Sequence, residues 1–188
     1  MRVISGSARG RKLKKVPGET TRPIMDRVKE SLFNILGQDV LETRWLDLFA
    51  GTGQVGIEAL SRGAAEVVFT DNARQAIKTI HENLRITGLS GQAKVLSVDA
   101  FAYLQQFGDR PFDVIYVAPP QYKGMWAEVM GILAERPSRF LTPTGFVIVQ
   151  IDPKEYRPLD WPAFTLADQR RYGNTQLDFY EQSADENG

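Results

Sequence analysis

Short apolar segments alternate with helix-like segments from residue 43 to residue 152, and this alternation constrains the fold more than any other feature. Strands are expected at 43–49, 65–71, 93–100, 112–118 and 144–152. Helices are expected at 53–62, 73–87 and 123–135, with a shorter one near 101–107. Because parallel strands need a crossover between them, this order predicts an α/β fold with a mostly parallel, doubly wound sheet.

The two ends of the chain do not follow the alternating pattern of this central part. Apolar residues at helical spacing predict an amphipathic helix over 22–36, after a basic N-terminal segment. The segments 164–173 and 175–182 predict an antiparallel hairpin that turns at Gly173-Asn174. We therefore expect a small N-terminal appendage over 1–37, a main domain over 38–182 and a polar tail over 183–188.

Length and composition exclude several classes of protein. The chain has 188 residues, enough for one domain with a sizeable core, and no apolar run approaches the roughly 20 residues of a membrane-spanning helix. It has no cysteine and one histidine, which excludes disulfides and thiolate chemistry and predicts no metal site. The N-terminus lacks the apolar core of a signal peptide, so we expect a cytoplasmic protein.

Basic residues are concentrated at the N-terminus. Residues 1–29 hold nine Lys or Arg against two acidic residues, although the formal net charge of the whole chain is zero. This asymmetry is typical of a nucleic-acid contact, and the alternative is a solvated, partly flexible N-terminus. The predicted RNA-binding residues are Arg9, Arg11, Lys12, Lys14, Lys15 and Arg22.

The stretch "DLFAGTG" (47–53) lies where the first strand passes into a helix. Gly51 and Gly53 allow the backbone to pass close to a ligand and to direct amide groups toward it. With Gly56 they match the spacing of a dinucleotide fingerprint, but Asp47 would repel an anionic pyrophosphate. An acid at this point favours a cationic ligand such as S-adenosylmethionine over a nicotinamide cofactor.

Two further acids end the next two strands. Asp71 is placed to accept both ribose hydroxyls of an adenosine, while Asp99 and the amide of Ala100 are placed to meet the adenine. One acid at a strand end is commonly a helix cap, but three at successive strand ends favour a ligand site. The predicted cofactor-binding residues are Asp47, Phe49, Gly51, Gly53, Asp71, Asn72, Asp99 and Ala100.

The fourth strand ends in "APPQY" (118–122), where a Pro-Pro pair stiffens the loop and fixes the preceding carbonyl groups. An exocyclic amine of a base is a poor nucleophile, because its lone pair is delocalised into the ring. Acceptors that hold both of its N–H bonds would orient the nitrogen for attack on a sulfonium methyl. An aromatic residue beside them can stack on the base.

Blocks of the chain resemble the RsmD family of small-subunit ribosomal RNA guanine-N2 methyltransferases, in the right order over residues 1–181. The matching blocks are "RVISGSARGRKL", "TRPIMDRVKESLFNIL", "LDLFAGTGQVGIEALSRGA", the Pro-Pro loop and "RRYGNTQL". The resemblance implies a Rossmann-like methyltransferase fold, S-adenosylmethionine as the methyl donor, and ribosomal RNA or the small subunit as substrate of a monomeric enzyme. It places Pro119, Pro120, Gln121 and Tyr122 in the catalytic loop.

One departure from the family pattern falls in that loop. The family has Asp-Pro-Pro followed by Phe or Tyr, whereas this chain has Ala118 before the prolines and Gln121 before Tyr122. Alanine cannot accept a hydrogen bond, so one acceptor for the amine is missing. Either Gln121 or another acceptor replaces it, or the protein is a non-catalytic RNA-binding assembly factor that keeps the donor pocket. Cysteine-dependent C5 methylation of pyrimidines is excluded, since the chain has no cysteine.

Overall fold

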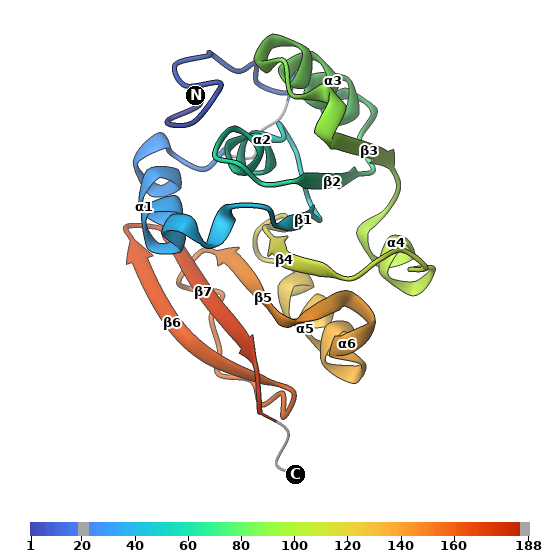
Figure 1. The fold of residues 1–188 in the computed structure, drawn as a ribbon. Coiled ribbons are helices and arrows are strands. Elements are labelled where there is room, and N and C mark those ends of the chain that lie inside the picture. Colours follow the sequence, from blue (N-terminus) through green and yellow to red (C-terminus); the bar gives the residue numbers. More distant parts are fainter. Residues whose placement is uncertain (19–22, 185–188) are drawn as a thin grey trace. The chain divides into compact units, whose positions relative to one another are not determined.

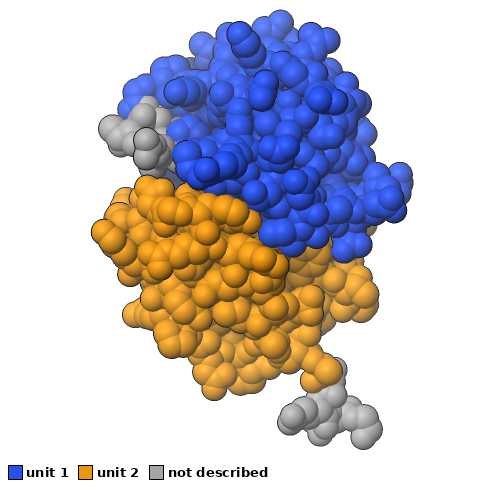
Figure 2. All heavy atoms as spheres, turned by 90° about the vertical axis from the view of Figure 1, so that its left-hand side faces the viewer, with its two compact units in different colours: residues 1–106 blue, residues 107–188 orange. Residues whose placement is uncertain are grey.

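The computed structural model describes residues 1–18 and 23–184, and its ribbon is shown in Figure 1. The chain divides into two compact units, Met1–Gln106 and Phe107–Gly188, which Figure 2 draws in blue and orange. The expected basic residue Arg22 lies outside the described residues. The expected boundary at residue 37 falls inside unit 1 and stays a prediction.

Unit 1 contains three parallel strands with helices between them. Its elements are α1 (Asp26–Leu36), η1 (Gly37–Val40), β1 (Arg44–Asp47), α2 (Gln54–Ser61), β2 (Glu66–Asp71), α3 (Arg74–Thr87), η2 (Ser90–Gln92), β3 (Ala93–Ser97) and α4 (Ala100–Gln105). The strand order is β3-β2-β1, with Asp47 opposite Phe69 and Asp71 opposite Ser97. The parallel register brings the carboxyl ends of the strands, where the predicted ligand acids stand, to one edge.

Helix α2 is buried along its whole length against β2. Gly56 makes this close packing possible, because a Cβ atom there would lie 2.3 Å from Cε1 of Phe69 and 2.8 Å from Cγ1 of Val67. Its Gly-x-x-Gly spacing from Gly53 therefore reflects packing of a helix onto a strand, which is the use that the third glycine of such loops serves.

The basic N-terminal segment is a docked hairpin. Its two arms are joined by backbone bonds such as Val3 N to Arg11 O (3.0 Å) and Leu13 N to Met1 O (3.1 Å). Four of its side chains, Val3, Ala8, Leu13 and Val16, are buried. We call residues 1–18 the arm. The apolar residues between the basic ones are therefore packed against the protein, while the basic side chains themselves are exposed.

A buried charge network fastens the arm to the helices of unit 1. Glu58 of α2 is fully buried and accepts from the backbone amides of Ile4 (2.9 Å) and Ser5 (3.0 Å) and from Arg62 Nε (2.8 Å). Lys29 of α1, also fully buried, lies 3.6 Å from Glu58 and donates to the carbonyl of Arg2 (2.6 Å). Burial lowers the pKa of Lys29, and Glu58 opposes that shift.

Unit 2 continues the α/β pattern and closes with antiparallel strands. Its elements are β4 (Phe112–Val117), α5 (Met125–Glu135), α6 (Pro137–Phe140), β5 (Leu141–Ile151), β6 (Phe164–Tyr172) and β7 (Thr175–Gln182). Strand β5 pairs in parallel with β4 and antiparallel with β7, which pairs antiparallel with β6. The last two strands form the orange-red ribbon of Figure 1.

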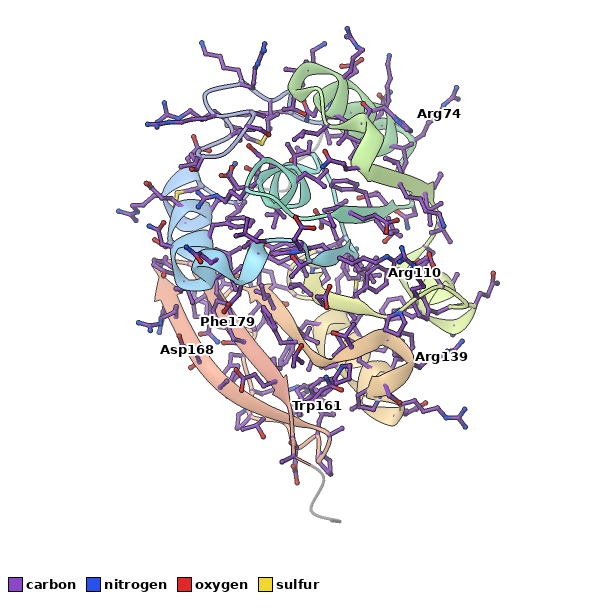
Figure 3. All side chains as sticks on the ribbon, viewed as in Figure 1. Arg74, Arg110, Arg139, Trp161, Asp168 and Phe179 are labelled. Carbon is purple, nitrogen blue, oxygen red and sulfur yellow. The ribbon has the colours of Figure 1, made fainter. Side chains whose placement is uncertain are left out.

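Aromatic side chains hold the connection between β5 and β6, residues 152–163. Trp161, labelled in Figure 3, meets the rings of Trp126 and Tyr180 edge to face, both at 5.8 Å between centroids. Tyr156 stacks on Trp126 at 6.4 Å. Edge-to-face and offset pairs at these distances are favourable. The connection is thus packed onto α5 and β7, and Trp126 is a core residue.

The predicted α/β class is confirmed, since three of the described strand pairs are parallel and the chain ends in the expected antiparallel hairpin. Among residues 1–18 and 23–184, no helix has the length and apolar character required to cross a membrane. The same residues contain no group of three or more His, Cys, Asp or Glu side chains arranged to hold a metal ion.

Candidate active site

The glycine loop between β1 and α2 adopts backbone conformations that few other residues reach. Gly51 has φ 54° and Gly53 has φ 76°, which favours glycine. A Cβ atom at Gly53 would lie 3.3 Å from Ile80, whereas at Gly51 it would meet nothing within 4 Å. The loop is tied to β2 by a bond from Ala50 N to the carbonyl of Thr70 (3.0 Å). Its geometry is therefore set by the backbone, with open space beside Gly51.

Asp71, at the end of β2, is fixed by two backbone amides. Its Oδ2 accepts from Gly51 N (2.9 Å), and its Oδ1 accepts from Ala73 N (2.9 Å). Each carboxylate oxygen has a second lone pair, so both can still accept one further hydrogen bond. The side chain is half-buried beside the glycine loop. Asp71 can thus offer two acceptors to one ligand while it holds the loop in place.

Asp47, at the end of β1, lies behind the same loop. It is 2% exposed and accepts from Gly56 N at 3.2 Å. Burial raises the pKa of its carboxyl to about 7, the bond from Gly56 opposes the shift, and the charge of Asp71 adds to it. A cation bound near Asp47 would favour its ionised form, whereas an anion would not.

Asp99 caps helix α4. Its Oδ1 accepts from Phe101 N (2.9 Å) and Ala102 N (3.1 Å), as a helix cap does. No described residue donates to its Oδ2, and the Asp99 side chain leaves the amide of Ala100 to another acceptor. Asp99 is therefore a helix cap, and this role leaves one carboxylate oxygen and one amide available at the end of β3.

The other predicted donor-site residues flank these acids. Phe49, half-buried, lies in the glycine loop, and Asn72, exposed, follows Asp71. Unit 1 thus carries every predicted cofactor-binding residue, on the carboxyl ends of β1, β2 and β3. Their roles in binding stay predictions.

The Pro-Pro loop belongs to unit 2 and follows β4. Pro119 is buried, Ala118 and Pro120 are half-buried, and Gln121 and Tyr122 are exposed. Strand β4 is buried along most of its length, so the loop leaves a rigid element. Position 118 carries no polar group, and no described residue bonds to the Gln121 side chain. The loop therefore presents an exposed amide side chain, that of Gln121, next to the two prolines.

The basic side chains of the arm differ in how free they are. Arg9, Arg11, Lys12 and Lys15 are exposed, and none forms an ion pair with a described residue. Lys14 lies 3.0 Å from Glu82, so its charge is partly compensated. The four unpaired side chains are better suited to contact phosphate groups than Lys14 is.

Asn83 of α3 is a residue that the sequence pattern did not single out. It is fully buried and both accepts from Lys14 N (2.7 Å) and donates to the carbonyl of Lys14 (3.0 Å). It also donates to the carbonyl of Thr52 in the glycine loop (2.9 Å). One side chain thus joins the arm to the loop. An amide residue at the helical spacing of the apolar face is the only signal that the sequence offers for the role of Asn83.

A model of one protein family, described as "Conserved hypothetical protein 95", matches residues 1–181. The chain belongs to this family. Its resemblance to the RsmD family is thereby confirmed. "Putative rRNA methyltransferase YlbH" of Bacillus subtilis is 37% identical over 96% of this chain and 98% of its own length. "Ribosomal RNA small subunit methyltransferase D" of Haemophilus influenzae is 33% identical over 96% of this chain and 93% of its own length.

Solved structures of relatives have the same fold as this family member. "Putative methyltransferase yhhF from Escherichia coli" is 32% identical, with a TM-score of 0.85 over 98% of both chains. An RNA methyltransferase from Salinibacter ruber, solved in complex with S-adenosyl-L-homocysteine, has a TM-score of 0.66 at 16% identity and covers 88% of this chain and 97% of its own. The expected Rossmann-like methyltransferase fold is confirmed.

Proposed function

We propose that this protein transfers a methyl group from S-adenosylmethionine to the exocyclic N2 amine of a guanine in small-subunit ribosomal RNA. The observation that carries the proposal is the carboxylate of Asp71, which holds the amide of Gly51 and keeps two acceptor positions beside an open glycine loop. Family membership supports the reaction, since relatives of this length are named as ribosomal RNA methyltransferases.

The donor side fits the residues of unit 1. S-adenosylmethionine supplies an electrophilic methyl group on a positively charged sulfur. Asp47 is the buried carboxylate that a cation stabilises, Asp71 offers acceptors to two ribose hydroxyls, and Asp99 with Ala100 offers an acceptor and a donor to the adenine. An anionic dinucleotide finds no basic partner among these residues. The donor set therefore favours a cationic nucleoside ligand.

The acceptor side depends on the Pro-Pro loop of unit 2. The carbonyl of Pro119 and the side-chain oxygen of Gln121 are the proposed acceptors for the two N–H bonds of the amine. Because the prolines restrict the backbone, the carbonyl keeps its direction without further reorganisation. Tyr122 is the proposed stacking surface for the base. Gln121 then takes the place of the acid that position 118 lacks.

The arm of unit 1 is the proposed contact to the RNA backbone. Its exposed side chains Arg9, Arg11, Lys12 and Lys15, which form no ion pair with residues 1–18 or 23–184, can neutralise phosphates. Arg22 stays a predicted contact. We further propose that the enzyme works as a monomer in the cytoplasm, on the small subunit or one of its assembly intermediates.

Ala118 favours a second candidate function. Without an acid at that position the protein could be a non-catalytic RNA-binding factor that has kept the donor pocket. Such a protein would bind the donor and the RNA through unit 1 and the arm but would not transfer the methyl group.

Transfer of a labelled methyl group separates the two functions. Small-subunit particles from a strain that lacks the gene are incubated with purified protein and labelled S-adenosylmethionine, and the modified nucleoside is identified. The proposal predicts labelled N2-methylguanosine. Donor binding without label in the RNA, on particles that a relative can modify, would leave the assembly factor.

A further inference from the structure

Tyr122 has an unusual backbone conformation. Its φ is 61°, and it is one of two non-glycine residues with positive φ among the described part of the chain. A bulky residue in this region is strained and persists only where the surroundings enforce it. Tyr122 is 63% exposed, so packing against a core does not enforce this conformation. Something else must hold Tyr122.

Two carboxylates bind Tyr122 at both of its polar ends. Glu155 Oε1 accepts from the backbone amide of Tyr122 (2.5 Å), and Asp152 Oδ2 accepts from its hydroxyl (2.6 Å). Asp152 is 6% exposed, and its other oxygen accepts from Lys154 N (2.9 Å). The first bond fixes the backbone of the loop residue, and the second fixes the direction of its ring.

Both carboxylates come from the connection between β5 and β6. Asp152 directly follows the buried end of β5, and Glu155 N donates to the carbonyl of Asp152 (2.9 Å) in a tight turn. The stacking of the adjacent Tyr156 on Trp126 anchors this turn to α5. The two acceptors are therefore presented from a packed segment.

The way in which Glu155 is bonded is explained better by a function than by a contribution to stability. The second oxygen of Glu155, Oε2, is buried and accepts no bond from a described residue. A buried acceptor without a partner costs folding free energy. A hydroxyl bond engages only the edge of the phenol ring, so both ring faces remain free of it.

We propose that Asp152 and Glu155 are positioning residues that together hold Tyr122 as a fixed stacking surface for the target base. This inference rests on the proposed function, in which Tyr122 stacks on the base. The two carboxylates do not touch the reacting atoms. They act through Tyr122, by removing the freedom of its backbone and of its ring before the RNA arrives.

A double-mutant cycle in methyl transfer tests the hydroxyl bond. Tyr122→Phe keeps the ring and loses the bond, and Asp152→Ala removes the acceptor. Each should lower kcat by about tenfold, as expected for loss of one hydrogen bond to a charged group. The double variant should be slowed about as much as either single one, because both changes remove the same hydrogen bond. Asp152→Asn keeps an acceptor oxygen and should recover most of the rate.

The backbone bond has its own test. Glu155→Ala should lower kcat by about tenfold and speed hydrogen exchange of the Tyr122 amide, whereas Glu155→Gln, which keeps an acceptor, should do neither. Hydrogen exchange reports this bond even if no activity is found. The matched control is Asp160→Ala, an exposed carboxylate on the same connection, which should match the wild type. Donor affinity should not change in any of these variants.

The outcomes separate this inference from the proposed function. A wild-type protein without methyl transfer would contradict the proposed function. An active wild type whose Tyr122→Phe and Asp152→Ala effects multiply in the double variant would overturn the positioning role of Asp152. Unchanged rate and unchanged Tyr122 exchange in Glu155→Ala would overturn that of Glu155.

Discussion

The glycine loop of unit 1 and the Pro-Pro loop of unit 2 are both short connections that follow buried strands, yet they are held in different ways. In the glycine loop, backbone groups bond mainly to the neighbouring strand β2 and to its terminal acid Asp71, and the carbonyl of Thr52 also accepts from Asn83 of α3. In the Pro-Pro loop, the bonds at Tyr122 go to side chains about thirty residues further along the chain.

The two loops therefore differ in which residues determine their conformation. A loop shaped mainly by its own glycines and by the adjacent strand depends on few residues elsewhere in the protein, here on Asn83. A loop held by distant carboxylates depends on residues outside its motif, so its sequence can drift while its support is kept. The substitution of Ala118 and the displacement of the aromatic residue to position 122 are found in the second kind of loop. Five predictions test how far the contrast goes.

The largest effect is expected in the Pro-Pro loop. Gln121→Ala and Tyr122→Ala should each lower turnover by about 10²–10³, the usual loss when one positioned group that acts in the transition state is removed. Donor affinity, measured by calorimetry, should stay near the wild-type value. A parallel loss of donor affinity would contradict the separation of the two loops.

Ala118→Asp restores the acid of the family pattern in the same assay. A lower rate is expected, because the loop is proposed to work through Gln121 and the new carboxylate would compete for the amine. A large gain in rate would instead identify the natural protein as a weakened enzyme.

A smaller effect is expected at Asp71. Asp71→Ala removes both ligand acceptors and the support of Gly51, so S-adenosylmethionine binding should weaken by about 1.5–3 kcal/mol. Asp71→Asn is the matched control, since its amide oxygen can still accept from Gly51. Calorimetric titration of the folded variants measures both. Equal affinity in Asp71→Ala and the wild type would remove Asp71 from the donor site.

The pKa of Asp47 predicts a pH effect of similar or smaller size. Burial raises this pKa to about 7, so the folded protein keeps the carboxyl protonated below that pH. The ionised form attracts a cation and the protonated form does not, so donor affinity should fall as the pH falls. Between pH 8 and pH 6 the loss should be about tenfold. Asp47→Asn should flatten the profile, and a sloped profile in that variant would assign the titration to another group.

The smallest effect per residue is expected in the arm. Neutralising Arg9, Arg11, Lys12 and Lys15 one after another should reduce the slope of log affinity for RNA against log salt by somewhat under one unit for each phosphate that is no longer neutralised. Lys14→Gln should reduce it less, since Lys14 is paired with Glu82. Donor affinity is the control and should not change. An unaltered slope in the fourfold variant would exclude the arm as the site of phosphate binding.

Regular elements were the most predictable part of the fold. The helix 73–87 and the strand 65–71 match α3 and β2 within one residue at each end, because their periodicity is strong and their ends are marked by Gly88 and Asp71. Helix α1 begins at Asp26, four residues later than expected. Strand β5 begins at Leu141, three residues earlier than expected. The expected start was too late because Thr142 and Pro143 resemble turn residues.

Long-range side-chain contacts were the least predictable part. The short helix α6 and the docking of the arm were not expected from the sequence. Glu58 and Lys29 are ionisable residues of a kind that is rarely buried unless paired, yet both are fully buried and lie 3.6 Å apart. The acids of the proposed donor site follow from their places at strand ends. Asp152 and Glu155 do not, because only the fold brings them to Tyr122.

Gly6 restricts what can replace the arm of this protein. A Cβ atom at Gly6 would lie 1.7 Å from the carbonyl oxygen of Ser61 at the end of α2, and its φ is 85°. Ser61 also exchanges bonds with Ser5 and Ala8 through its hydroxyl. The arm is therefore no interchangeable module. A chimaera that replaces the first 18 residues would have to keep a glycine at position 6 and the contacts to Ser61, so the arm cannot be exchanged independently of α2.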